Sequence, residues 1–234
     1  MRRSSAKTLV ALSALVGLAS CSSKDTADLT TTTETTTETT TTPTSTTTTI
    51  PQLEQPAIWP AANVSFQTPE EAAEDFVRNA LGVEPNIGEF QGGDSLSGEI
   101  DVYSPESEVV RGTLLLRKLG PSMSWFVTAA VNASNTISSP AHQSSIDAAV
   151  TEVTGKGRGY EAQLRVTAID ASAYSQPIDQ QFPMGGSAEE AFPFTTTLDL
   201  SEATSGSIVT IILQGSAGLE EDPGDFCAIA VRIN

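Results

Sequence analysis

The chain has 234 residues, a length that accommodates one large domain or two small ones. It carries 29 Asp and Glu against 12 Lys and Arg, and its formal net charge is −17. Nucleic-acid binding depends on Lys and Arg that neutralise phosphates, so this balance argues against a nucleic-acid partner and against a surface that lies on anionic lipid. We interpret the acidic excess as a feature that keeps a folded domain soluble.

The first 20 residues have the composition of a secretory signal peptide. Arg2, Arg3 and Lys7 form a positive segment, and an apolar run from Thr8 to Leu18 follows it. The run is shorter than the roughly 20 apolar residues that cross the hydrocarbon core of a bilayer. We therefore predict that residues 1–20 are removed and take no part in the fold, which changes the net charge from −17 to −20.

The apolar run ends in Leu18-Ala19-Ser20-Cys21, which resembles a bacterial lipobox. A signal peptidase holds the chain extended in a narrow site, so the residues before the cut must be small, and the cysteine thiolate accepts the diacylglycerol group. The alternative is an ordinary signal peptide followed by an accidental cysteine. Charge, apolar run and small residues agree in one register, which favours lipidation of Cys21. The resemblance implies a palmitate-bearing lipoprotein on the extracytoplasmic face of the cell membrane.

A threonine-rich tract occupies residues 21–58, with uninterrupted runs at 30–33, 35–37 and 39–42. Such a tract buries too little apolar surface to offset the entropy of ordering, so we predict a disordered linker. At about 3.1 Å per residue it reaches roughly 110 Å when extended. We interpret it as a spacer, and its threonine and proline content is also typical of glycosylated stalks.

One helix is predicted after this linker. Thr68-Pro69-Glu70-Glu71 forms a capping box with proline at the first helical position, and Gly82 supplies the stop. The apolar residues between them recur on one helical face: Ala72, Ala73, Phe76, Val77, Ala80 and Leu81. The acidic residues of this segment lie in its early turns, where the helix dipole favours them.

Three strands are predicted next, at residues 98–103, 109–118 and 123–131. In the third strand, alternate positions are apolar and should form one buried face: Met123, Trp125, Val127, Ala129 and Val131. A helix followed by a three-stranded meander can enclose a small core. We therefore expect a compact α+β unit over residues 59–132.

The remaining chain is predicted to form short strands without a helical period. After a loop at Ser138-Ser139-Pro140, the expected strands are 146–153, 161–170, 192–200, 207–214 and 226–233. Alternation is clearest in 161–170, where Gln163, Arg165 and Thr167 face away from the apolar side chains. Pro193 should place its strand at a sheet edge. The expected fold class is mainly β with one helix, in which a β-sandwich over residues 135–234 follows the α+β unit.

Several segments carry a resemblance to a known family. They are Ser138-Ser139-Pro140, Val150 to Gly155, Gly159-Tyr160-Glu161, Ala191-Phe192-Pro193-Phe194 and Gly215-Ser216-Ala217 through Ile233. They resemble the immunoglobulin-like domain of bacterial spore germination proteins and of many actinobacterial lipoproteins. Residues 68–73 and 124–127 are similar to the module that often precedes it. The family's second Ser-Pro is replaced by Ser144-Ser145-Ile146, which leaves the entry into the first sandwich strand open. The resemblance implies an extracytoplasmic β-sandwich without catalytic residues.

Candidate reactive residues are few. His142 is the one histidine, and without a positioned nucleophile and orienting group it is expected to be a solvated loop residue. Cys227 lies on the apolar side of an alternating strand and is expected to be a small buried hydrophobe. With Cys21 lipidated, no disulfide is expected.

The acidic run of Glu220, Glu221, Asp222 and Asp225 is a weak candidate calcium loop, because calcium prefers several carboxylate oxygens on one turn. It lacks EF-hand spacing, and the alternative is a solvated hairpin loop that keeps sheet edges apart. Trp125 is expected in the core, and Trp59 is left open between the core and a sugar-stacking platform. An exposed cluster of Trp59, Tyr103, Tyr160 and Tyr174 would favour carbohydrate binding.

Taken as a whole, the sequence predicts a membrane-anchored interaction or structural module of the cell envelope, without enzyme activity or cofactor. Its expected partners are the membrane, through the lipid on Cys21, and a cell-wall component or envelope protein. The alternative is a module that binds cell-wall glycan. The aromatic residues named above are the sequence features that bear on this alternative.

Overall fold

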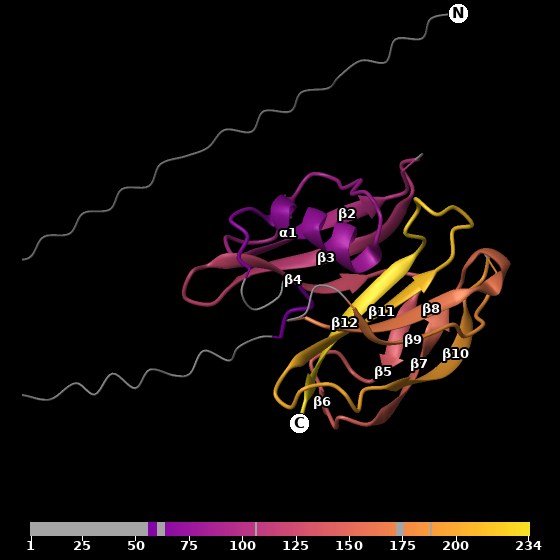
Figure 1. The fold of residues 1–234 in the computed structure, drawn as a ribbon. Helices are drawn as coiled ribbons and strands as arrows, with labels where there is room; N and C mark the ends of the chain where they lie inside the picture. Colours follow the sequence, from indigo (N-terminus) through magenta and orange to yellow (C-terminus); the bar gives the residue numbers. More distant parts are fainter. Residues whose placement is uncertain (1–55, 60–63, 106, 172–175, 188) are drawn as a thin grey trace, which may run out of the picture. The chain divides into compact units, whose positions relative to one another are not determined.

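In the computed structural model, which describes residues 56–59, 64–105, 107–171, 176–187 and 189–234, the chain is mainly antiparallel β with one α-helix (Figure 1). The helix α1 (Pro69–Phe76) continues as a single π-helical turn, η1 (Val77–Leu81). A short 3₁₀ turn, η2, spans Tyr160–Ala162. The strands form one large and one small sheet in a sandwich-like arrangement.

The helix begins and ends where the sequence predicts. The Thr68 hydroxyl accepts a hydrogen bond from the Glu71 backbone N–H at 3.2 Å, and the Glu71 carboxylate accepts one from the Thr68 N–H at 3.3 Å. This reciprocal pair satisfies donors that the first turn leaves free. Gly82 ends the helical segment in the left-handed conformation with φ 79°, which glycine adopts without steric cost.

The large sheet contains nine strands. Their order is β1-β2-β3-β4-β12-β11-β8-β9, and β6 pairs in parallel with β12. Their bounds are β1 Gln91–Gly92, β2 Ser97–Tyr103, β3 Val110–Leu119, β4 Ser124–Val131, β6 Ser145–Ile146, β8 Leu164–Asp170, β9 Pro177–Gln181, β11 Ile208–Gly215 and β12 Phe226–Ile233. The sheet therefore joins strands from both halves of the chain.

The small sheet has the order β10-β7-β5, with bounds β10 Phe192–Asp199, β7 Val150–Gly157 and β5 Thr136–Ser139. It faces β8, β11 and β12 in the second half of the chain. The predicted edge position of Pro193 is confirmed, because β10 has β7 as its one hydrogen-bonded neighbour among the described strands.

Strand β12 is buried on both faces. Phe226, Ala228 and Ala230 pack into a core with α1, β2, β3 and β4. The alternate residues pack into a second core with β7, β8, β10 and β11, and they are Cys227, Ile229, Val231 and Ile233. A strand that is apolar on both faces is typical of the centre of a layered structure. We call these the helix-side core and the sandwich core.

The two expected units meet within one sheet. Ala228 of β12 pairs with Ala130 of β4, so the large sheet continues past the predicted boundary at residues 132–135. The described residues also group into one compact unit. The cores follow the expected division only in part, because β11 and β12 supply Ile212 and Phe226 to the helix-side core.

The second half has the topology of an immunoglobulin-like sandwich. Strands β5, β7 and β10 form one sheet, and β9, β8, β11 and β12 lie in the facing sheet. Consecutive strands β7 and β8 lie in different sheets, as do β9 and β10. These crossings between the layers are the Greek-key connections of that architecture.

The predicted buried face of β4 is wrong at its two ends, Met123 and Val131, whereas Ala129 is buried as predicted. A bulge at Thr128 places Leu115 opposite Ala129 and Leu116 opposite Val127, so the side-chain alternation shifts by one residue. Ala130 consequently packs into the helix-side core, while Val131 is 46% exposed. Met123, at the other end of the expected buried face, is 45% exposed.

Several strands of the second half also differ from the sequence prediction. The expected loop at Ser138-Ser139-Pro140 contains the end of β5, and the expected strand 146–153 is divided between β6 and β7. Strand β8 begins at Leu164 because the η2 turn occupies the preceding residues, with Glu161 at φ 54°. Strand β9 was not predicted.

We expect the two cores to unfold together because they share β12. In a Cys21→Ala background Cys227 is the single thiol and reports on the sandwich core, while Trp59 and Trp125 report on the helix-side core. Phe226→Ala removes a ring with 0% exposure and should lower the free energy of unfolding by about 3–5 kcal/mol. Urea titrations followed by tryptophan fluorescence and by thiol labelling should give one shared midpoint.

Phe192→Ala is the matched control, because this ring is 50% exposed and its loss should change stability by about 0.5 kcal/mol or less. Separate midpoints for the two probes would contradict a shared central strand.

Candidate functional site

The acidic loop is part of a buried ionic cluster. Asp222 receives hydrogen bonds from the Arg111 guanidinium, from the Ser104 hydroxyl at 2.6 Å and from the Gly224 N–H at 2.8 Å. Its side chain is only 1% exposed. The alternative of a solvated hairpin loop is therefore wrong for Asp222.

Asp225 is the second acid of this cluster and is also buried. It accepts a hydrogen bond from Arg158 Nε at 2.9 Å and forms a longer pair with Arg111 at 3.4 Å. The buried Asn135 side chain joins the same cluster by donating to the Asp225 carbonyl at 2.7 Å and accepting from the Arg158 N–H at 2.8 Å. The cluster thus fastens the end of β7 and the link after β4 to the loop before β12.

The charges of this cluster stabilise one another. Burial acts to raise the pKa of Asp222, but the hydrogen bonds from Arg111, Ser104 and Gly224 outweigh it and hold that pKa below its ordinary value. Burial likewise acts to lower the pKa of Arg111, and its contacts with Asp222 and Asp225 raise that pKa above the ordinary value. The arginines therefore do for these carboxylates what a bound cation would do.

This arrangement bears directly on the weak candidate calcium loop. Asp222 and Asp225 are held by arginines, whereas Glu220 and Glu221 are exposed. In the part of the chain that the structure describes, no group of three or more His, Cys, Asp or Glu side chains is placed to hold a metal ion. Asp222 and Asp225 therefore join this loop to Arg111 and Arg158 through ion pairs.

His142 and Cys227 occupy unreactive positions. His142 is exposed, as expected of a loop residue, but its Nδ1 accepts a hydrogen bond from the Ala230 N–H at 3.1 Å, and partial desolvation lowers its pKa. Cys227 is 5% exposed in the sandwich core, and burial raises the pKa of its thiol to about 12. The predicted role of Cys227 as a buried hydrophobe is confirmed.

Both tryptophans belong to the helix-side core. Trp125 is 6% exposed and packs edge-on against Phe90, with ring centroids 5.1 Å apart, which confirms its predicted core position. Trp59 is 1% exposed, and its indole N–H donates to Asp75 at 2.7 Å. The exposed aromatic cluster that would favour carbohydrate binding does not include Trp59, which is buried, whereas Tyr160 is exposed. Tyr174 lies outside the described residues.

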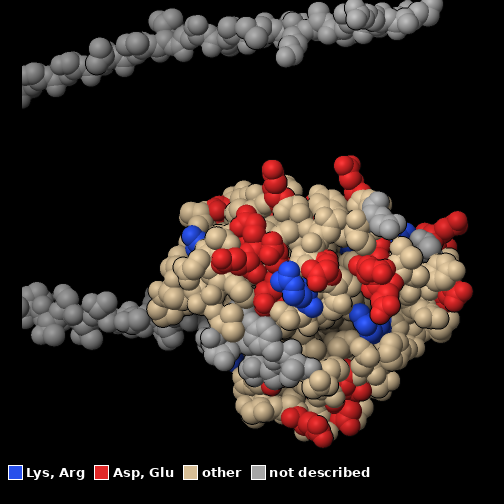
Figure 2. All heavy atoms as spheres, turned by 45° about the horizontal axis from the view of Figure 1, so that its top comes forward, with Lys and Arg blue, Asp and Glu red and all other residues tan. Residues whose placement is uncertain are grey.

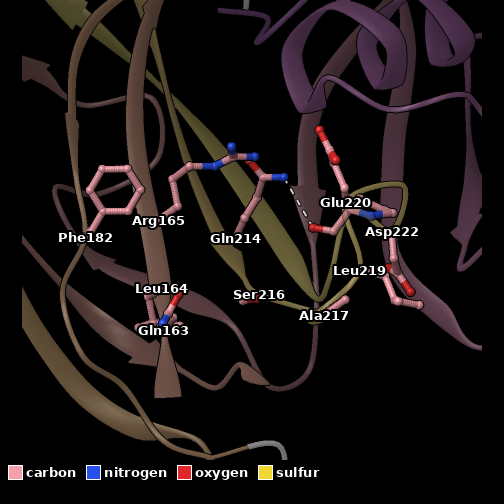
Figure 3. Close-up of a pocket in the computed structure, with 12 residues that line it drawn as sticks. Gln163, Leu164, Arg165, Phe182, Gln214, Ser216, Ala217, Leu219, Glu220 and Asp222 are labelled. Carbon is pink, nitrogen blue, oxygen red and sulfur yellow. Dashed lines mark hydrogen bonds between the residues drawn. The ribbon is translucent and has the colours of Figure 1, made fainter. Parts of the chain in front are cut away.

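A hollow that the sequence analysis did not identify lies over β8 and β11. Its volume is about 280 Å³, and its lining includes Arg165, Phe182, Gln214, Ser216 and Glu220. Figure 3 shows the Arg165 and Gln214 side chains alongside each other, with Phe182 on the neighbouring segment that follows β9. Arg165 Nη2 donates to Gln214 Oε1 at 2.7 Å, and Gln214 Nε2 donates to the Pro223 carbonyl at 3.3 Å.

A second hollow of about 200 Å³ shares Arg165 and Gln214 with the first. Its other walls are the end of the helical segment, including Asn79, and β8–β9 residues that include Thr167 and Gln180. Gln180 Nε2 donates to the Thr167 hydroxyl at 3.0 Å. Because Arg165 and Gln214 line both hollows, we describe the two hollows together as the Arg165 groove.

The Arg165 groove had a signal in the sequence, although a partial one. Gln163, Arg165 and Thr167 were predicted to face away from the apolar side of their strand, and this face forms part of the groove. Gln214 is 49 residues away from Arg165 in the sequence, and the pairing of β8 with β11 brings the two together. The alternation of polar and apolar residues within each strand does not predict which strands pair.

The surface around these features is acidic. Figure 2 shows acidic side chains distributed over the visible face, with a few basic side chains among them. Arg78, Arg111 and Arg158 each form an ion pair with a carboxylate. Arg165 forms no ion pair with any described Asp or Glu residue.

We predict that Asp222→Asn lowers the free energy of unfolding by about 1–3 kcal/mol at neutral pH, because it leaves buried donors unsatisfied. The lowered pKa means that the folded state favours the ionised carboxylate more than the unfolded chain does. This contribution is therefore present above about pH 4 and is lost as the pH falls through the folded-state pKa.

Urea unfolding at pH 7 and at acidic pH, followed by tryptophan fluorescence, measures both effects. The matched control is Glu221→Gln, which changes an exposed neighbouring acid. An equal loss of stability in the two variants would contradict the role assigned to Asp222.

Cys21 and residues 21–55 of the predicted linker lie outside the described residues. Within the described part of the chain, no helix has the length and apolar character needed to cross a bilayer. Comparisons with protein-family models, with curated proteins and with solved structures found no match for this chain.

Proposed function

We propose that this protein is an extracytoplasmic lipoprotein, held at the cell membrane by a lipid on Cys21, whose β-rich head is a non-enzymatic binding or structural module. The observation that carries the proposal is the order of three sequence features: a positive segment, an apolar run too short to span a bilayer, and Leu18-Ala19-Ser20-Cys21. The threonine-rich linker then separates the head from the membrane.

The chemistry of the described side chains supports a non-enzymatic role. His142 accepts a backbone hydrogen bond through Nδ1, and the Cys227 thiol is buried with a pKa of about 12. Asp222 and Asp225 are bound to arginines. A nucleophile or general base needs an accessible side chain with a positioned catalytic partner. Cys227 lacks the access, and the exposed His142 is bonded to a backbone N–H, which is no such partner.

The resemblance to the spore-germination-type immunoglobulin-like domain is retained as part of this proposal. The two facing sheets of residues 136–233 support it, because their topology agrees with that architecture. A shared architecture accommodates many functions, so the binding role has to be argued from the surface.

Carbohydrate binding is the second candidate, and the Arg165 groove favours it. The groove combines amides, hydroxyl groups, one guanidinium and the carboxylates of Glu220 and Asp222 with the Phe182 ring, which is 70% exposed. Polar side chains beside an exposed ring are typical of surfaces that bind sugars. The two tryptophans are buried, so this candidate rests on the groove and not on a tryptophan platform.

We predict that Cys21→Ala moves the protein from the membrane fraction to the soluble extracytoplasmic fraction and abolishes labelling by a radioactive or clickable palmitate precursor. The physical reason is the loss of the thiolate that carries the lipid. Cys227→Ala is the matched control, since it removes the other cysteine and should leave both readouts unchanged. Retention of the Cys21→Ala variant in the membrane, at the level of the wild type, would refute the lipid anchor.

A further inference from the structure

The Arg165 guanidinium is held in position by one hydrogen bond and keeps further N–H donors available. One of its N–H groups donates to Gln214, which is 4% exposed and is itself fixed by the Pro223 carbonyl. The remaining donors of the guanidinium have no partner among the described residues. A planar group of this kind is suited to a carboxylate, which can accept two parallel hydrogen bonds from it.

The surroundings of Arg165 reduce its hydration. The side chain is partly buried between β9 and β11, and this desolvation lowers the pKa of the guanidinium although the group stays charged. A partly desolvated cation without a carboxylate partner gains more from an anion than an exposed arginine does. In a protein with a net charge of −17, such an arginine stands out from the paired arginines of the ionic cluster.

The shape of the groove indicates what kind of molecule carries the carboxylate. Arg165 and Gln214 line both hollows, so the guanidinium borders open space on two sides. A chain with carboxylates along its length can pass over a cation that open space borders on two sides. Amides and hydroxyl groups on both sides, including Gln163, Ser216 and Gln180, can exchange hydrogen bonds with sugar hydroxyls.

We infer that the Arg165 groove binds an acidic polysaccharide, with Arg165 pairing a sugar carboxylate and the flanking amides contacting neighbouring sugar hydroxyls. This inference rests on the proposed binding function of the head, and it assigns the ligand class and the site. Phe182, at one side of the groove, supplies an apolar ring face for a pyranose ring.

The test uses oligosaccharides that contain galacturonate, glucuronate or N-acetylmuramate, each paired with its neutral methyl ester. Isothermal titration against the full chain in detergent should show binding of at least one acidic oligosaccharide, about tenfold or more weaker binding of its ester, and weaker binding as salt is added. A tripeptide with a free C-terminal carboxylate and its amide form the second arm. Binding confined to the peptide arm would overturn the inference.

Three variants locate the site. Arg165→Gln should weaken binding of the acidic oligosaccharide by about tenfold or more, and Arg165→Lys should restore part of it, because lysine keeps the charge but loses the planar fork. Glu220→Gln should strengthen binding, since Glu220 lines the same groove and repels an anion. Arg78→Gln is the control, as it removes a half-exposed arginine that does not line the groove.

The outcomes separate the site from the function. If wild type and Arg165→Gln bind the acidic oligosaccharide equally, the head binds glycan but the assigned site is wrong. If no oligosaccharide binds the wild type, the ligand class fails and the glycan-binding candidate fails with it. The opposite sign expected for Glu220→Gln keeps the inference testable even if Arg165→Gln does not fold.

Discussion

The burial of β12 on both faces is the constraint on which the rest of the structure depends. One set of alternate side chains completes the helix-side core and the other completes the sandwich core. Removing this strand from water therefore stabilises both layers at once, in proportion to the apolar area buried on each face. Its pairing with β4 on one side and β11 on the other makes a single sheet from two halves of the chain.

The positions of the buried charged residues are related to this joining of the two halves of the chain. Where the two halves meet, Arg111 and Arg158 neutralise Asp222 and Asp225, so buried acids are tolerated because each has a cation and further hydrogen bonds. On β8, by contrast, Arg165 lines a hollow together with the end of the helical segment, and among the described residues its guanidinium is bonded to the Gln214 amide alone. Arg111 and Arg158 thus stabilise the fold, whereas Arg165 lines a hollow and has donors left for a ligand.

Local sequence patterns were sufficient to predict most helices and strands. Features that depend on contacts between residues distant in sequence could not be predicted from them. The capping box, the Gly82 stop and the alternation in residues 226–233 act over a few residues, and all were predictable. The bulge at Thr128, the pairing of Ala130 with Ala228 and the burial of Asp222 depend on partners far along the chain. The groove was missed for the same reason, because its two central side chains come from β8 and β11.

The position of β12 in the sequence has a consequence for assembly. Residues 226–233 follow every other described strand, yet both cores require them. A chain that leaves a ribosome or a membrane pore amino end first has therefore delivered all its other strands before either layer can close. Until then the chain is incompletely folded and accessible to chaperones and proteases. The addition of this one short strand completes both layers together.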